Sequence, residues 1–125
     1  MSDYRVLLVD DEEEFVSALS ERLMLRGIEA DCALNGEEAL ARMMEKEFEV
    51  VILDVLMPGL GGLEVLRQIK STHPNTQVIL LTGHGSTREG IEGMRLGAFD
   101  YLIKPVDIEE MLAKMKEAGE TARVS

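Results

Sequence analysis

The sequence predicts an α/β fold in which a single doubly wound, five-stranded parallel sheet is covered by five helices. Short apolar runs typical of buried strands alternate five times with segments whose apolar residues recur at helical spacing. The connections between them are only a few residues long, which favours right-handed crossovers and helices on both faces of the sheet. At 125 residues, the chain has the size of one domain with its own core.

The first half of the chain contains three predicted strands and two predicted helices. Arg5–Val9 and Val50–Asp54 are nearly continuous apolar runs, as expected for strands buried on both faces. Ile28–Leu34 has apolar side chains at every second position, which is also typical of a strand. Two intervening helices are indicated by apolar residues at helical spacing: Phe15, Leu19 and Leu23 in the first, and Ala39, Leu40, Met43 and Met44 in the second.

The second half repeats the alternation. Leu63, Leu66 and Ile69 predict a third helix that ends near Pro74, and Val78–Leu81 predicts a buried strand that ends in Thr82. A fifth strand follows Gly97 and ends at Ile103. The last helix is predicted from the cap Asp107 and the apolar stripe Ile108, Met111, Leu112 and Met115, and residues 119–125 are expected to form a fraying tail.

The fourth helix is expected to be the least stable element. Ser86 and Glu89 have the spacing of a capping box, and Ile91 and Met94 supply the apolar residues of this helix. Gly90 and Gly93 weaken it, because each glycine costs about 1 kcal/mol relative to alanine inside a helix.

The composition excludes several classes of function. A net charge of −11, with 24 acidic and 13 basic residues, argues against direct binding of nucleic acid by this domain. No apolar stretch approaches membrane-spanning length and no leader pattern is visible, so we expect a cytoplasmic protein with no membrane association. Cys32 is the only cysteine, and we interpret it as a core residue of a protein without disulfides.

Polar residues follow four of the five predicted strands: Asp10 and Asp11, Asp54, Thr82 and Lys104. The carboxyl ends of parallel strands lie at one edge of a sheet, so these side chains should converge although they are distant in sequence. Each also has an ordinary structural reading: a turn residue for Asp54, helix capping for Asp10 and Asp11, a strand-end β-former for Thr82 and a surface lysine for Lys104. Four such accidents at four strand ends are much less probable than one site.

The chemistry of such a site favours a metal ion and a phosphoryl group. Three clustered carboxylates repel one another unless a cation neutralises them, and hard oxygen ligands suit Mg²⁺. Lys104 and Thr82 could then contact a phosphoryl group, with Asp54 as an ionised nucleophile that needs no separate base.

These residues together resemble the receiver domains of bacterial two-component response regulators. The resemblance extends over essentially the whole chain and is carried by Val6–Asp11, Leu53–Gly59, Leu81–Gly83 and Asp100–Pro105. It implies a flavodoxin-like sheet of order 2-1-3-4-5 and a cis peptide bond between Lys104 and Pro105. It also implies the site: Asp54 as phosphoacceptor, Asp10, Asp11, Asp54 and the backbone carbonyl of Leu56 around Mg²⁺, Thr82 as switch hydroxyl, Lys104 as the phosphoryl-pairing lysine and Tyr101 as switch aromatic.

The expected function is therefore a phosphorylation-activated switch. A sensor histidine kinase, or a small phosphodonor, would phosphorylate Asp54, and residues 4–119 would form the receiver domain, with residues 120–125 as a tail or linker stub. The surface of the fourth helix, fifth strand and fifth helix would then control an output domain or a downstream protein. The same surface is a candidate interface for a homodimer. We expect no turnover of a separate substrate beyond the domain's own phosphorylation and dephosphorylation.

Two other functions use a similar sheet. A haloacid-dehalogenase-type phosphatase resembles this pattern in its nucleophilic aspartate, but it has a second acid two residues later, where this chain has Leu56. A flavodoxin-like cofactor carrier needs a neutral phosphate loop after the first strand, and the acidic run Asp10–Glu14 would repel a phosphate. A receiver fold used without phosphorylation is disfavoured because the full set of residues is present.

Overall fold

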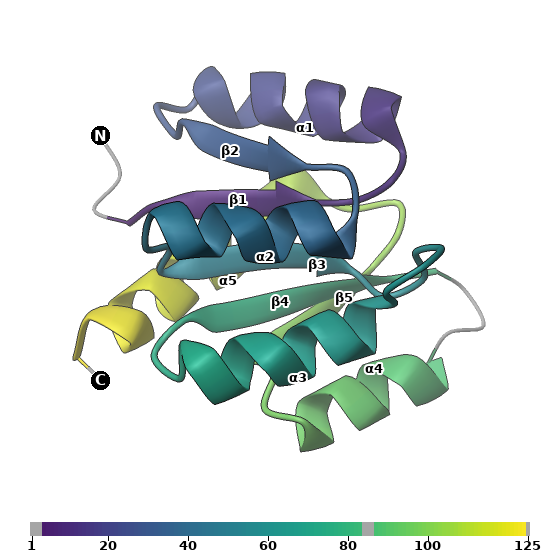
Figure 1. Ribbon diagram of the computed structural model, residues 1–125. Helices are drawn as coiled ribbons and strands as arrows, with labels where there is room; N and C mark the ends of the chain where they lie inside the picture. Colours follow the sequence, from purple (N-terminus) through teal and green to yellow (C-terminus); the bar gives the residue numbers. More distant parts are fainter. Residues whose placement is uncertain (1–3, 84–86, 125) are drawn as a thin grey trace.

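The five strands form one parallel sheet of order β2-β1-β3-β4-β5 in the computed structural model, which describes residues 4–83 and 87–124 (Figure 1). The strands are β1 (Val6–Val9), β2 (Ala30–Ala33), β3 (Val50–Asp54), β4 (Gln77–Thr82) and β5 (Asp100–Ile103). The predicted fold class and sheet order are confirmed. β3 is the central strand, with β1 and β4 as its two partners.

Five helices alternate with the strands: α1 (Glu13–Met24), α2 (Gly36–Glu45), α3 (Gly62–Thr72), α4 (Thr87–Arg95) and α5 (Ile108–Val124). Helices α2 and α3 pack on one face of the sheet, and α1 and α5 pack on the other (Figure 1). Successive side chains of a strand point to opposite faces of the sheet, so in β1 Leu7 faces the α2–α3 layer and Leu8 faces the α1–α5 layer. Each face of the sheet thus has its own apolar cluster.

Two helices differ from the sequence-based expectation. Helix α5 is helical to Val124, so the segment expected to fray continues the helix. Its second half is anchored, because Ala118 is fully buried and Gly119 lies directly beneath the Tyr4 ring. The expected cap Asp107 is confirmed, since its Oδ1 accepts a hydrogen bond of 2.9 Å from the Glu109 N–H.

The orientation of α4 is the second difference. Ile91 and Met94 are 51% and 41% exposed, whereas Gly90 and Gly93 are buried. A Cβ on Gly93 would overlap the Leu80 side chain of β4, and one on Gly90 would lie 3.1 Å from the Tyr101 ring of β5. The glycines therefore allow a close approach of α4 to the sheet. Ser86, the expected cap of this helix, lies outside the described residues, as does His84.

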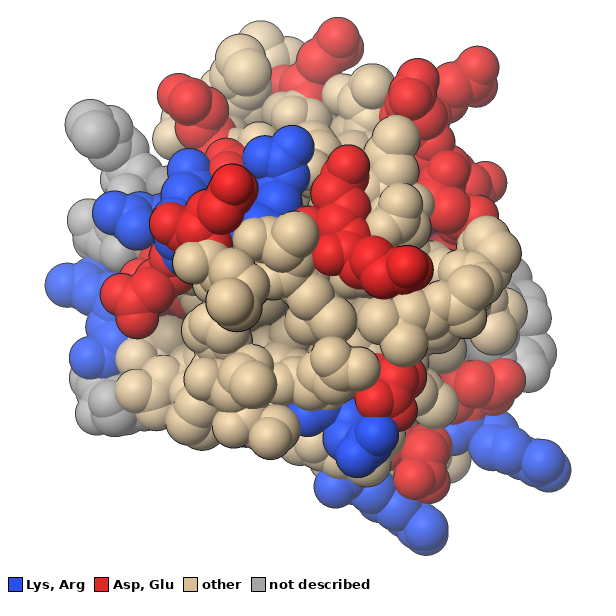
Figure 2. Space-filling view, in the orientation of Figure 1, with Lys and Arg blue, Asp and Glu red and all other residues tan. Residues whose placement is uncertain are grey.

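The surface is mixed in charge over the face seen in Figure 2. On this face, Lys and Arg side chains are interspersed with Asp and Glu side chains. Over the same described ranges, every helix is too short or too polar to cross a membrane.

The first turn of α3 fixes the backbone at the end of β3. The Gly62 N–H donates a hydrogen bond of 3.1 Å to the Val55 carbonyl oxygen. A Cβ at position 62 would overlap the Asp54 carbonyl oxygen and lie 2.7 Å from the Val55 Cα, so only glycine fits this contact. The position of Asp54 thus depends on helix α3 as well as on the sheet.

We predict that Gly62→Ala destabilises the protein by about 1–3 kcal/mol, the usual cost of forcing extra atoms into a packed site. Gly61→Ala is the matched control: its backbone has φ −69° and nothing lies within 4 Å of its Cβ position. Because Gly61 is the N-cap of α3, where alanine is less favourable than glycine, this variant should lose at most about 1 kcal/mol. Urea unfolding measures both. Equal stability of the two variants would contradict the close contact at Gly62.

Candidate phosphoryl and metal site

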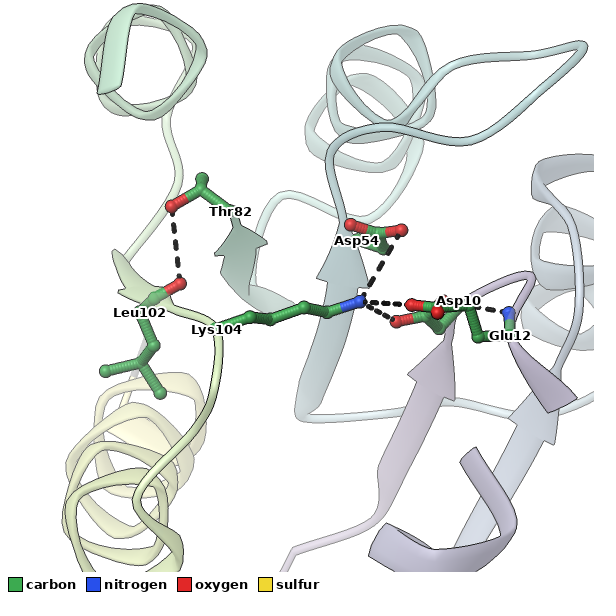
Figure 3. A network of polar contacts seen from close by, with 6 residues as sticks. All are labelled: Asp10, Glu12, Asp54, Thr82, Leu102 and Lys104. Carbon is green, nitrogen blue, oxygen red and sulfur yellow. Dashed lines mark hydrogen bonds and ion pairs between the residues drawn. The ribbon is translucent and has the colours of Figure 1, made fainter. Parts of the chain in front are cut away.

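The predicted residues converge at the carboxyl edge of the sheet (Figure 3). Asp10 follows β1, Asp54 ends β3, Thr82 ends β4, and Lys104 follows β5. One carboxylate oxygen from each of Asp10, Asp11 and Asp54 lies within 4.8 Å of the others. Asp10 and Asp54 are only 2% and 6% exposed, whereas Asp11 is exposed. The cluster therefore has two buried acids and one that opens to solvent.

Lys104 reaches across this edge from β5 (Figure 3). Its Nζ donates hydrogen bonds to Asp10 Oδ2 at 2.7 Å and to Glu12 Oε1 at 3.0 Å, and lies 3.9 Å from Asp54 Oδ2. The ammonium also stands over the Phe15 ring, 4.5 Å from its centroid. It is thus closer to the Asp10 side of the site than to Asp54. The peptide bond that follows Lys104 is cis, as the resemblance implied.

The electrostatics of Asp54 reflect its crowded surroundings. Burial, and then repulsion from Asp10, raises the pKa of the Asp54 carboxyl to about 6. The positive charge of Lys104 and a hydrogen bond from the Leu56 backbone N–H oppose this increase. The carboxylate is still mostly ionised at neutral pH, but the free energy of folding is less favourable for this ionised form.

Partial burial disfavours the charge on Lys104, but hydrogen bonds to Asp10 and Glu12 outweigh that cost and raise the pKa of the ammonium. Lys104 consequently stays charged at all physiological pH values. It provides a permanent counter-charge for the acidic cluster.

The two expected switch residues lie on neighbouring strands. Thr82 follows Leu81, which pairs in register with Asp54. Its side chain is buried, and its Oγ1 donates a long hydrogen bond of 3.4 Å to the Leu102 carbonyl oxygen of β5. The hydroxyl therefore points to β5 rather than to Asp54 (Figure 3). Tyr101 is half-buried, with its ring against Gly90 of α4.

The residues near Asp10 include features that the sequence did not single out. Asp10 Oδ1 accepts a hydrogen bond of 3.0 Å from the Glu12 N–H. The helix-capping reading of Asp10 and Asp11 does not hold, because the N-cap of α1 is Glu12. Glu12 and Phe15 were read only as parts of an acidic run and of an apolar stripe. Their contacts with Lys104 depend on where α1 begins, which the sequence predicts only to within a turn.

We predict that Asp54→Asn stabilises the metal-free domain by roughly 1–3 kcal/mol above pH 6, because a carboxyl whose pKa rises from 3.8 to about 6 on folding resists ionisation in the folded state. Below pH 4 the Asp54 carboxyl of the wild type is protonated, and its burial then carries no cost of charge. As the pH rises to about 6 the carboxyl ionises, and the wild type loses stability. The difference between variant and wild type should therefore grow between pH 4 and pH 6 and then level off.

Urea unfolding in a chelating buffer measures this difference. Asp31→Asn, which changes an acid of β2 that pairs with Lys46, is the control and should show no such increase. If the difference in the free energy of unfolding between Asp54→Asn and the wild type stays constant from pH 4 to pH 6, the raised pKa of Asp54 is wrong.

Comparison with known proteins agrees with this geometry. A sequence model described as the response regulator receiver domain matches residues 6–116. An uncharacterized transcriptional regulatory protein of Bacillus subtilis, YkoG, is 41% identical over 118 residues, which cover 94% of this chain and 52% of that protein. The regulatory protein AtoC of Escherichia coli is 39% identical over 107 residues, or 86% of this chain and 23% of AtoC. The chain thus spans about half of the length of YkoG and about a quarter of the length of AtoC.

Solved structures show the same fold. A response regulator receiver domain protein from Clostridium thermocellum has a TM-score of 0.91 and 34% identity, with 96% of this chain and 97% of that chain covered. The receiver domain of NtrX from Brucella abortus has a TM-score of 0.88 and 31% identity, with 93% and 98% covered. The chain belongs to the response regulator receiver domain family, whose members serve phosphorylation-dependent signalling in bacterial two-component systems.

Proposed function

We propose that this receiver domain is a phosphorylation-activated switch in which Asp54 accepts the phosphoryl group. The observation that carries the proposal is the cluster itself. Three carboxylates lie within 4.8 Å of one another around the end of the central strand, and an ammonium lies 3.9 Å from Asp54. The structural readings of the single residues do not explain why all four groups meet at one point.

The residues of the cluster fit a Mg²⁺ ion. Asp10, Asp11 and Asp54 offer hard oxygen ligands. Burial, and then repulsion from Asp10, raises the pKa of Asp54 despite the positive charge of Lys104. Asp10, Asp11, Asp54 and the backbone carbonyl of Leu56 would hold the ion. When bound, Mg²⁺ neutralises phosphoryl oxygens and orients the group for transfer.

The transfer step uses the Asp54 carboxylate as nucleophile. One Asp54 oxygen attacks the phosphorus of a phosphohistidine in a sensor kinase, or of a small phosphodonor, and forms an O–P bond. The P–N bond, or the bond to the small donor's leaving group, breaks, and its electron pair stays with the leaving group. Because Asp54 is mostly ionised above its pKa of about 6, the step needs no general base. Lys104 would pair with a phosphoryl oxygen and stabilise its charge.

The signal would pass through Thr82 and Tyr101. In the phosphorylated state the Thr82 hydroxyl would leave the Leu102 carbonyl and bind a phosphoryl oxygen, and the Tyr101 ring would move inward from its place against Gly90. The hydrogen bond of Thr82 to Leu102 is long, at 3.4 Å, and the Tyr101 ring is only half-buried, so this rearrangement requires little free energy. The surface of α4, β5 and α5 would change as a result.

That surface has the character of a partner site. Ile91 and Met94 of α4 and Ile103 of β5 are 41–51% exposed, and exposed apolar residues of this kind favour contact with another protein. An output domain, a downstream protein or a second copy of the domain would bind there. In YkoG, the part that matches this chain makes up 52% of the length, and the remainder is long enough for an output region.

We propose that the domain is not an enzyme with a separate substrate, although it would catalyse its own phosphorylation and dephosphorylation. A phosphatase of the haloacid dehalogenase type would need a second acid at position 56. Leu56 is 59% exposed beside the site and provides no ionisable group there.

We predict that Asp54→Ala abolishes labelling by acetyl phosphate, because the variant lacks the attacking oxygen. Intact-mass spectrometry measures the phosphoryl increment, and a chelator should suppress it in the wild type. Asp31→Ala removes an acid that is remote from the site and pairs with Lys46, so this control should be labelled normally. Undiminished labelling of a folded Asp54→Ala variant would refute the assignment of Asp54.

A further inference from the structure

Lys104 has two contacts that the proposed phosphoryl chemistry does not use. Its Nζ donates a hydrogen bond of 3.0 Å to Glu12 Oε1 and stands 4.5 Å from the centroid of the Phe15 ring. Glu12 is the N-cap of α1, and Phe15 lies in the first turn of the same helix. Both contacts therefore come from α1, on the Asp10 side of the acidic cluster.

These contacts draw the ammonium away from Asp54. Lys104 is 2.7 Å from Asp10 and 3.0 Å from Glu12, but 3.9 Å from Asp54. Its side chain is 20% exposed, whereas that of Glu12 is 65% exposed. Since Glu12 is otherwise open to water, breaking its ion pair with Lys104 requires little energy.

We propose that Glu12 is a positioning residue that, together with the Phe15 ring, holds Lys104 on the Asp10 side of the site in the unphosphorylated domain. This inference rests on the proposed function, because it concerns the lysine that would pair with the phosphoryl group. A phosphoryl group on Asp54 must compete with the Glu12 carboxylate for the same ammonium. Glu12 thus opposes the phosphorylated state, and α1 contributes to setting the balance between the two states.

The direction of the effect follows from this competition. Removing the charge of Glu12 leaves Lys104 freer to bind a phosphoryl mimic at Asp54. Because an ion pair with one exposed member is weak, the gain in affinity should be about two- to fivefold. Glu13 is the matched control: it carries the same charge one residue further along α1, is exposed, and is not among the acids paired with Lys104.

The test measures binding of the beryllium trifluoride anion in the presence of Mg²⁺, followed by amide chemical shifts of the whole chain. We expect Glu12→Gln to bind this phosphoryl mimic about two- to fivefold more tightly than the wild type, and Glu13→Gln to change the affinity by clearly less. Equal effects of the two substitutions would mean that only the total charge matters, and would overturn the inference. Weaker binding by Glu12→Gln would overturn it as well.

A second measurement observes Lys104 directly, without metal or mimic. The ε-methylene protons of Lys104 should be shifted upfield by the Phe15 ring, and Phe15→Leu should abolish this shift and so assign it. Glu12→Gln should reduce the upfield shift, whereas Glu13→Gln should preserve it. An unchanged shift in Glu12→Gln would overturn the positioning role, even if the affinity changed.

The two measurements separate the failure of this inference from the failure of the proposed function. If the wild type binds no beryllium trifluoride with Mg²⁺, the proposed function fails and the role of Glu12 in phosphorylation fails with it. If the wild type binds the mimic but Glu12→Gln behaves like Glu13→Gln, only the inference about Glu12 fails.

Discussion

Repulsion among the carboxylates at the carboxyl edge of the sheet is the constraint on which the site depends. Asp10 and Asp54 are almost completely buried. Lys104 is the cation that forms ion pairs with both of these carboxylates among the described residues. The sheet order imposes this crowding, because β1 and β3 are neighbours and Asp10 and Asp54 lie just at or beyond their ends. The fold thus keeps together groups that would separate in an unfolded chain. Burial of Asp54, and then repulsion from Asp10, raises the pKa of its carboxyl as a result.

Several contacts around the site are long or have an exposed partner, which suits a switch. Thr82 makes a long hydrogen bond to Leu102, and Lys104 shares its charge between Asp10 and an exposed Glu12. Tyr101 rests against α4, which approaches the sheet through its glycines rather than through large apolar side chains. Adding charge at Asp54 would therefore have to overcome little to rearrange β5 and its flanking helices. In contrast, the backbone of Asp54 itself is firmly held by Gly62.

Much of the fold and site could be predicted from the sequence, because both follow from local rules. Apolar runs such as Val50–Asp54 indicate buried strands, and strand ends in a parallel sheet must meet at one edge, which predicts the meeting of Asp10, Asp54 and Lys104. The orientation of α4 could not be predicted, since the glycine cost per residue says nothing about how closely a helix can approach a sheet. The contacts of Lys104 with Glu12 and Phe15 were missed, because they depend on the exact start of α1 and on side-chain conformation.

We propose that Asp10, Asp11 and Asp54 form one divalent cation site, distinct from the general acidity of a chain with net charge −11. Titration with substoichiometric Mn²⁺, followed by paramagnetic broadening of amide signals, tests this claim directly. We expect the signals of Asp10, Asp11 and Asp54 to broaden first and excess Mg²⁺ to restore them. Broadening that begins instead along the exposed acids of α2, such as Glu37 and Glu38, or that spreads evenly over the acidic surface, would contradict it.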